Sequence, residues 1–340
     1  MDQEQLRATA QTIVQDGKGI LAADESTPTC TKRFEKLGIP STEQSRRDYR
    51  AMLFTTPGIE ASLGGVILYD ETLRQCTVDG TAIPELLEGR GILPGIKVDT
   101  GAKPLAGHPG EKVTEGLDGL RERLEEYVAL GARFAKWRAV ITIGTGPDGE
   151  PLPSSACLAA NADGLARYAA LCQEAGLVPI VEPEVLVDGD HGIDESERAH
   201  RATWHAVFNA LHDHDVYLPG ILLKPSMVMS GKDAPDRAGS EEVARRTFEA
   251  LLDHVPASVP GIVFLSGGQT PEEATEHLRI MNKLGPKPWS LSFSYGRALQ
   301  EPALLAWKGD AANAATAQAA LRERCEANRA AARGKALVNA

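Results

Sequence analysis

Short, nearly continuous apolar runs recur along the chain, and amphipathic stretches separate them. Runs without polar alternation are typical of strands covered on both faces, as in a parallel sheet. The eight predicted strands are 19–23, 65–69, 93–98, 133–136, 178–181, 221–223, 261–265 and 291–293. Each ends at or just before a polar residue: Asp24, Asp70, Asp99, Lys136, Glu182, Lys224, Ser266 and Ser294.

The intervening stretches carry helix signals. Ser41-Thr42-Glu43-Gln44 has a capping-box pattern that predicts a helix through Phe54, and Thr270-Pro271 is a helix start with proline in the first turn. Further helices are predicted at 116–130, 162–175 and 240–254. The polar residues are 28 to 46 positions apart, the length of a strand–helix unit.

Eight such units favour an α/β fold of the (β/α)8 TIM-barrel type, in which the C-terminal strand ends form the active-site face. An open, doubly wound sheet is the alternative, because periodicity alone does not show closure. No linker divides the chain, so residues 1–340 are predicted to form a single domain. An alanine-rich helical region is expected at about 303–336.

Composition and charge limit the kinds of partner that the protein can bind. The net charge of −11 argues against nucleic acid or an acidic membrane surface as a partner. Neither a secretory signal nor an apolar run of membrane-spanning length is present. The five cysteines are dispersed, which indicates free thiols in a reducing compartment. We therefore expect a cytoplasmic protein without membrane or nucleic-acid partners.

Lys224 is the first candidate for chemistry, since it ends the apolar run of Pro219-Gly220-Ile221-Leu222-Leu223. Desolvation lowers the pKa of a lysine, and a neutral amine can add to a ketone to form a Schiff base. Taken alone, a lysine that extends into solvent is the more common outcome. If the barrel closes, Lys136 lies near Lys224, and two neighbouring ammonium groups are expected to lower one of the two pKa values.

Carboxylates are predicted at the same barrel end. Glu182 and Glu184, held apart by Pro183, are candidates for proton transfer, and Asp24 follows the first strand. Each could equally be an ordinary charged residue that faces water. Together, two lysines and several acids at one barrel end favour a functional site.

Two anion sites are predicted around this centre. Glycines let backbone N–H groups approach an anion, and an arginine can bind it in bidentate fashion. The candidates after the seventh and eighth strands are Ser266, Gly267, Gly268, Ser294, Gly296 and Arg297. Those across the barrel end are Ser26, Lys32, Arg33 and Lys97. Turn glycines without a ligand are the alternative for Gly267 and Gly268.

Two further patterns are weak evidence, one for dinucleotide binding and one for a metal site. Gly144 to Gly149 match G-x-G-x-x-G, but Glu150-Pro151-Leu152-Pro153 follow and cannot open the helix that a dinucleotide fingerprint needs. The pairs His212 and His214, and His200 and His205, could suggest a metal, but His212 and His214 lie at a predicted helix end outside the strand-end set. No Cys or third His lies at ligand spacing. We expect no metal and no cofactor.

Several of these segments resemble, in order, the signatures of the class I fructose-bisphosphate aldolase family. They are 17–26, 134–138, 178–184, 222–225, 264–269 and 293–299, within a resemblance from about Gly17 to beyond Trp307. It implies metal-free, reversible cleavage of fructose 1,6-bisphosphate to dihydroxyacetone phosphate and glyceraldehyde 3-phosphate. It also implies a homotetramer that acts on sugar phosphates.

The resemblance assigns roles as well. It implies that Lys224 forms the Schiff base, Glu182 transfers protons, Asp24 accepts the C4-hydroxyl proton and Lys136 modulates the charge around both. The phosphates would be held by the predicted anion sites. One departure is a C-terminal tyrosine of animal and plant relatives: here the last tyrosine is Tyr295. Others are the longer loop at 144–153 and local differences at 27–29.

Three alternatives remain from the sequence. The first is a lysine-dependent aldolase for sedoheptulose bisphosphate or a ketose monophosphate. The second is a non-catalytic barrel that binds a sugar phosphate or a protein. The third is a metal-dependent aldolase, whose activity a chelator would remove.

Overall fold

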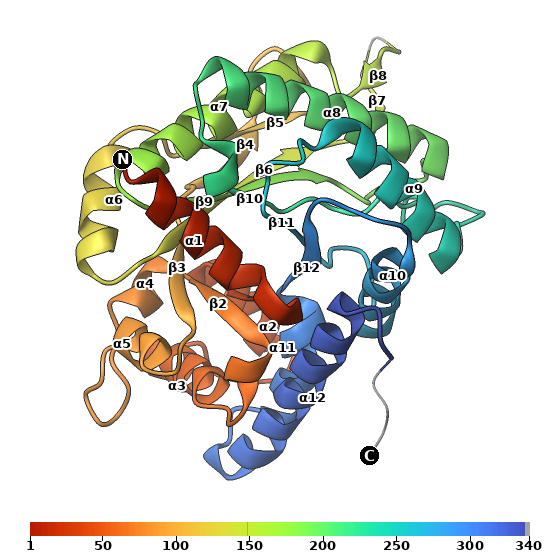
Figure 1. Ribbon diagram of the computed structural model, residues 1–340. Coiled ribbons are helices and arrows are strands. Elements are labelled where there is room, and N and C mark those ends of the chain that lie inside the picture. The colour runs from red at the N-terminus through yellow and green to blue at the C-terminus, as the bar shows by residue number, and fades with distance from the viewer. Residues whose placement is uncertain (148, 337–340) are drawn as a thin grey trace.

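Eight parallel strands close into a barrel with helices around it (Figure 1). The computed structural model describes residues 1–147 and 149–336. Around the ring the strands are β1 (Gly19–Ala23), β2 (Leu63–Leu68), β3 (Leu93–Lys97), β6 (Phe134–Ile141), β9 (Val178–Val185), β10 (Leu222–Leu223), β11 (Gly261–Phe264) and β12 (Ser290–Tyr295). Because β1 pairs with β12, the predicted (β/α)8 TIM barrel is confirmed and the open sheet is excluded.

One helix, α1, precedes the first strand, and the others come between the strands or after the last one. The helices are α1 (Gln3–Val14), α2 (Thr27–Glu35), α3 (Glu43–Phe54), α4 (Asp70–Leu73), α5 (Ile83–Glu88), α6 (Leu120–Ala129), α7 (Ser155–Glu174), α8 (Ile193–Asp213), α9 (Ser240–His254), α10 (Pro271–Lys283), α11 (Arg297–Trp307) and α12 (Ala314–Ala332). The alanine-rich region thus carries α12, which packs outside the barrel against α10 and α11 (Figure 1). In the described part, no helix is both long and apolar enough to cross a membrane. The single-domain organisation stays a prediction.

The N-terminal end of the barrel is closed by α1, the red helix that crosses it in Figure 1. Its buried residues are Leu6, Ala10, Ile13 and Val14. They form one apolar cluster with inward residues of the strands: Ile20, Ala22, Ile67, Phe134, Val178, Ile180, Leu222 and Val263. We call this cluster the floor of the barrel.

Phe134 fills the centre of the floor. A Cβ atom added to Gly65 or Gly95 would lie 2.8 or 2.2 Å from its ring, which is too close for either position to carry a side chain. The two glycines on β2 and β3 therefore make room for one large aromatic residue on β6.

Three strands are longer than the apolar runs predicted. β6 continues to Ile141, β9 to Val185 and β12 to Tyr295, so Lys136, Glu182 and Ser294 lie within strands and not after them. Polar side chains on these strands can face the barrel interior, where they interrupt the apolar pattern without ending the strand.

The start of α3 and the segment from Gly144 differ from the local predictions. The capping box of α3 is formed by Thr42 and Ser45, one residue later than the pattern suggested. The segment from Gly144 begins β7 (Gly144–Thr145), which pairs with β8 (Pro151–Leu152) as a small antiparallel hairpin. Since no helix follows it directly, it is not a dinucleotide-binding turn. The other small sheet joins β4 (Gly101–Pro104) and β5 (Lys112–Glu115).

Candidate active site

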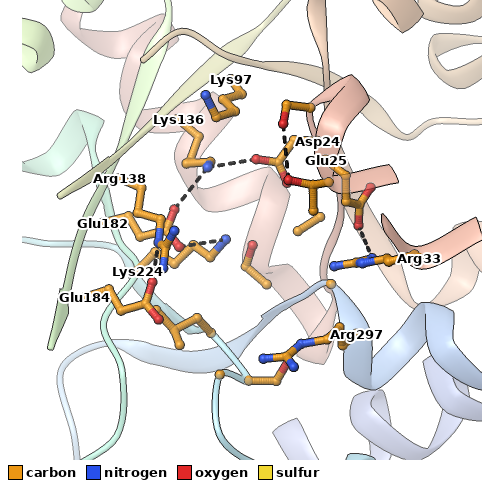
Figure 2. Close-up of a pocket in the computed structure, with 18 residues that line it drawn as sticks. Asp24, Glu25, Arg33, Lys97, Lys136, Arg138, Glu182, Glu184, Lys224 and Arg297 are labelled. Carbon is orange, nitrogen blue, oxygen red and sulfur yellow. Dashed lines mark hydrogen bonds and ion pairs between the residues drawn. The ribbon is translucent and has the colours of Figure 1, made fainter. Parts of the chain in front are cut away.

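A cavity of about 250 Å³ opens at the C-terminal ends of the strands. It is lined by Ala22, Asp24, Glu25, Ser26, Thr29, Arg33, Lys97, Lys136, Arg138, Glu182, Glu184, Lys224, Leu265, Ser266, Gly267, Ser294, Gly296 and Arg297 (Figure 2). All of the site residues predicted from the sequence belong to this lining except Lys32 and Gly268. We call this end of the barrel the mouth.

Gly268 is one of these two exceptions. Its backbone has φ +76°, a left-handed conformation that favours glycine, and a Cβ atom there would lie 2.2 Å from Val187. The alternative of a turn glycine therefore fits Gly268, whereas its neighbour Gly267 reaches the cavity.

Two lysines and two carboxylates form a chain of ion pairs at the centre of the mouth (Figure 2). Lys136 Nζ lies 2.7 Å from Asp24 Oδ2 and 3.3 Å from Glu182 Oε2. The other oxygen of Glu182 lies 3.2 Å from Lys224 Nζ. Glu182 thus bridges the two ammonium groups, and Lys136, Glu182 and Lys224 are all buried.

Within these ion pairs, each charged group favours the ionised form of its partner. Burial by itself would raise the pKa of Asp24, but Lys136 and Lys224 hold that pKa well below its usual range. Burial by itself would lower the pKa of Lys136, yet Asp24, Glu182 and Asp99 raise it. The prediction that paired lysines lower a pKa is therefore wrong for Lys136, since its nearest partners are acids and not the other lysine.

The barrel register explains how these groups meet. Lys97 on β3 pairs with Lys136 on β6, and Arg138 on β6 pairs with Glu182 on β9. The backbone N–H of Lys224 donates to Val181 O at 2.8 Å, which sets this lysine next to the strand position of Glu182. Successive inward positions of neighbouring strands thus place these charged groups around one space.

Glu184, which the sequence analysis grouped with Glu182 for proton transfer, contacts an arginine. Its carboxylate accepts a hydrogen bond from Arg138 Nε, so it is neutralised by an arginine and not by the lysine chain. Glu182 and Glu184 therefore do not act as an equivalent pair: the first contacts both lysines, and the second is held by Arg138.

Anion-binding groups border this centre on two sides. On one side lie Ser266 and Gly267 after β11 and Ser294, Gly296 and Arg297 where β12 passes into α11. Gly296 is the N-cap of α11, whose first N–H groups are suited to an anion. The Arg297 guanidinium makes no ion pair with the described residues, and Ser294 Oγ is buried without a hydrogen-bond partner among them.

On the other side the cations already have carboxylate partners. Arg33 on α2 donates to Glu25 Oε1 at 2.6 Å, and Lys97 Nζ lies 2.8 Å from Asp99 Oδ1. Ser26, the N-cap of α2, also faces the cavity. An anion on this side would share Arg33 and Lys97 with the acids that they contact.

Comparisons with known proteins agree over nearly the whole chain. The sequence model of the fructose-bisphosphate aldolase class-I family matches residues 5–339. The chain is 56% identical to the probable fructose-bisphosphate aldolase class 1 of Xanthomonas campestris, over 98% of this chain and 99% of that protein. It is 52% identical to the cytosolic fructose-bisphosphate aldolase 5 of Arabidopsis thaliana, over 98% and 91%. The chain belongs to the class-I fructose-bisphosphate aldolase family.

A solved structure of this aldolase family has the same fold. The aldolase of Plasmodium falciparum, crystallised with TRAP and a small-molecule inhibitor, superimposes with a TM-score of 0.96 at 46% identity. The alignment covers 99% of this chain and 96% of that one. The chain is accordingly a metal-independent carbon–carbon lyase that reversibly cleaves fructose 1,6-bisphosphate to two triose phosphates, as in glycolysis.

The mouth of this aldolase contains residues that the sequence analysis did not select. Arg138 and Glu25 are the charged ones, and Thr29 on α2 joins them in the lining. Arg138 follows Lys136 by two positions on one strand, so strand alternation could have indicated it. Glu25 accepts from Gln300 Nε2 at 2.8 Å as well as from Arg33, and neither contact could be read from spacing.

The histidines considered for a metal lie on α8 or, in the case of His214, at its C-terminal end. In the part of the chain that the structure describes, no set of three or more His, Cys, Asp or Glu side chains could hold a metal ion. His200, one of the histidines considered for a metal, is buried on α8 and contacts Ser226.

Proposed function

We propose that Lys224 is the residue of this aldolase that forms the Schiff base with the substrate ketone. Its ammonium is buried and lies 3.2 Å from Glu182, a carboxylate that can accept its proton. The neutral amine would then add to the C2 carbonyl, giving a carbinolamine. This contact between a buried lysine and an acid at the mouth is the observation that carries the proposal.

Glu182 is proposed to move protons in the following step. It would return a proton to the carbinolamine hydroxyl, which leaves as water while the nitrogen lone pair forms the iminium. Lys136 contacts the second oxygen of Glu182 at 3.3 Å and remains a cation, since its pKa is raised by the acids around it despite burial. Lys136 would therefore stabilise each negative charge that forms there.

Asp24 is proposed as the base for carbon–carbon cleavage. Its lowered pKa keeps the carboxylate ionised, against the effect of burial, because Lys136 and Lys224 lie nearby. It would take the C4-hydroxyl proton as the C3–C4 bond breaks. The bonding electron pair would pass into the iminium to form an enamine, and glyceraldehyde 3-phosphate would leave. Protonation of the enamine and hydrolysis would release dihydroxyacetone phosphate.

The two anion-binding sides of the mouth are proposed to hold the two phosphates. Ser266, Gly267, Ser294, Gly296 and Arg297 would bind one of them, and Ser26, Arg33 and Lys97 the other. Arg297, which makes no ion pair with the described residues, supports the first assignment. Glu184 would act through Arg138, its partner at the rim.

Reductive trapping tests the nucleophile. Borohydride added with dihydroxyacetone phosphate should leave one covalent adduct, and mass mapping should place it on Lys224. Lys224→Ala should remain folded and lose both the adduct and turnover. The matched control is Lys232→Ala, because Lys232 is an exposed lysine of the same segment that pairs with Asp188. An adduct on another lysine would refute the assignment, and a chelator should leave the activity unchanged.

We further propose a cytoplasmic homotetramer. The family resemblance supports the tetramer, and two plant relatives are named as cytosolic aldolases. Light scattering coupled to size exclusion would test the assembly, and a monomer at assay concentration would refute it.

A further inference from the structure

A buried pair outside the cavity, His200 on α8 and Ser226 just after Lys224, joins the two segments that carry Lys224 and Glu182. Neither residue lines the mouth. Both are buried, with side chains almost inaccessible to water. Consecutive hydrogen bonds link Ser196, His200, Ser226 and Val185, and each has a defined donor and acceptor.

The backbone carbonyl of Ser196 determines which group donates in each of these hydrogen bonds. His200 Nδ1 lies 2.8 Å from Ser196 O, and a carbonyl oxygen can only accept, so the ring proton is on Nδ1. Nε2 is then an acceptor, and the Ser226 hydroxyl donates to it at 2.9 Å. The same hydroxyl oxygen accepts from the backbone N–H of Val185 at 3.0 Å.

This arrangement requires a neutral ring. Burial lowers the pKa of His200 to about 4, which keeps the imidazole uncharged at neutral pH. A protonated ring would present a second N–H to a hydroxyl that already donates its proton toward it.

The position of Ser226 matters because β10 is short. β10 ends at Leu223, and its ladder with β9 ends where Lys224 N–H donates to Val181 O. The next residue of β9 that could donate on that side is Pro183, which has no N–H. The following one is Val185, and its N–H is taken by Ser226 Oγ.

These two bonds bracket the proposed reacting groups. One joins the segments before Glu182, and the other joins them after Glu184. Among the described residues, the Ser226 contact is the hydrogen bond that joins residues 224–226 to β9 beyond Val181, apart from the ion pair between Lys224 and Glu182 itself. The distance between Lys224 Nζ and Glu182 Oε1 depends on how these two segments are held.

We infer that His200 and Ser226 are positioning residues for the aldolase reaction: the Nδ1–H form of His200 orients the Ser226 hydroxyl, which holds β9 in register with Lys224. The inference depends on the proposed roles of Lys224 and Glu182. Neither residue touches the substrate, so both act through the geometry of the lysine–carboxylate contact.

Ser226→Ala tests the link directly. It removes the acceptor of Val185 N–H, and small misplacements of reacting groups can lower rates by up to about 100-fold. We expect kcat to fall about tenfold or more, with KM changed by less than about threefold, because no hydrogen bond among the described residues joins the proposed phosphate-binding side chains to this pair. Trapping with dihydroxyacetone phosphate and borohydride should slow in parallel, with the adduct still on Lys224.

Thr247→Val is the matched control. Thr247 is buried on α9, and its hydroxyl accepts from Val228 N–H at 2.9 Å, two residues after Ser226. The variant therefore loses a comparable buried acceptor that does not reach β9. Its kcat should stay within about twofold of the parent. An equal fall in kcat in both variants would show a general packing effect and overturn the inference.

A pair of His200 variants decides the matter if Ser226→Ala does not fold. His200→Gln offers an amide oxygen near the position of Nε2, whereas His200→Phe keeps a ring without an acceptor. We expect kcat to be largely retained in the first and to fall in the second. Equal kcat values in both would overturn the role of His200. Unchanged kcat with an adduct on Lys224 refutes only this inference, while an adduct on another lysine refutes the proposed function.

Discussion

The two ends of the barrel are built from the same strands and have opposite chemistry. β6 contributes Phe134 to the floor and Lys136 to the mouth, two positions further along. β9 contributes Ile180 and then Glu182. Residues two apart on a strand face the same side, so a single step along the interior passes from an apolar layer to a charged one.

The difference separates stability from reactivity. Burying a large apolar side chain contributes about 1.5–3 kcal/mol, so the floor and α1 favour folding directly. Buried ion pairs, by contrast, add little net stability because desolvation offsets their attraction. The mouth is therefore expected to carry the chemistry and the floor to carry the stability, and changes at either end test this division.

The largest expected effect is on activity, from Lys136→Met. The variant keeps a side chain of similar length and removes the cation between Asp24 and Glu182. We expect kcat/KM to fall by about 10²–10⁴, the range found when a proton-transfer or charge-stabilising group is lost. Steady-state assays would measure it, and circular dichroism would confirm folding. Lys103→Met, at an exposed site, is the control. Activity within about tenfold would contradict the central role of Lys136.

The next effect is on stability, from Phe134→Ala. Removing this ring empties the space that Gly65 and Gly95 leave for it, and substitutions of this kind cost about 3–5 kcal/mol. Denaturant unfolding would measure the loss. The kcat of the folded fraction should stay within about threefold. A large fall in kcat without loss of stability would show that the floor and mouth are not separable.

A smaller loss is expected from Gly95→Ala. The added methyl would lie 2.2 Å from the Phe134 ring, and overpacking of a core costs about 1–3 kcal/mol. Combined with Phe134→Leu, the loss should be less than the sum of the two single losses, because the smaller side chain yields space. Additive losses in a double-mutant cycle would show that the ring and the glycine are not in conflict.

The barrel could be predicted because its strands are buried on both faces and so appear as uninterrupted apolar runs. The convergence of Asp24, Lys136, Glu182 and Lys224 follows from the closed barrel, so it could also be predicted from the sequence. Which of these side chains contacts which could not be predicted from the sequence. The pKa of Lys136 is raised and not lowered, since the sign depends on which group is nearest, and the nearest group is Asp24, which follows the non-adjacent strand β1.

The floor helix shows a signal that was missed. Leu6, Ala10, Ile13 and Val14 follow helical spacing, so the sequence does carry a signal for α1. Contacts such as Arg138 with Glu184 and Arg33 with Glu25 join separate elements and leave no local pattern. The same holds for Ser226 and His200, which lie 26 positions apart.

The smallest expected effect concerns the start of the helix that closes the floor. Asp2 is the N-cap of α1, and its carboxylate accepts from Gln5 N–H at 3.0 Å. Asp2→Ala should cost about 1 kcal/mol of stability, the usual loss for an N-cap, while Asp2→Ser should restore most of it. Because the cap lies just before Leu6, the first floor contact of α1, fraying there loosens the floor without reaching the mouth, and kcat should be unchanged in both variants. A stability loss near that of Phe134→Ala would mean that α1 docks as a unit from its first turn. A fall in kcat would mean that the floor transmits its packing to Lys136 through β6, and the division between the two ends would fail.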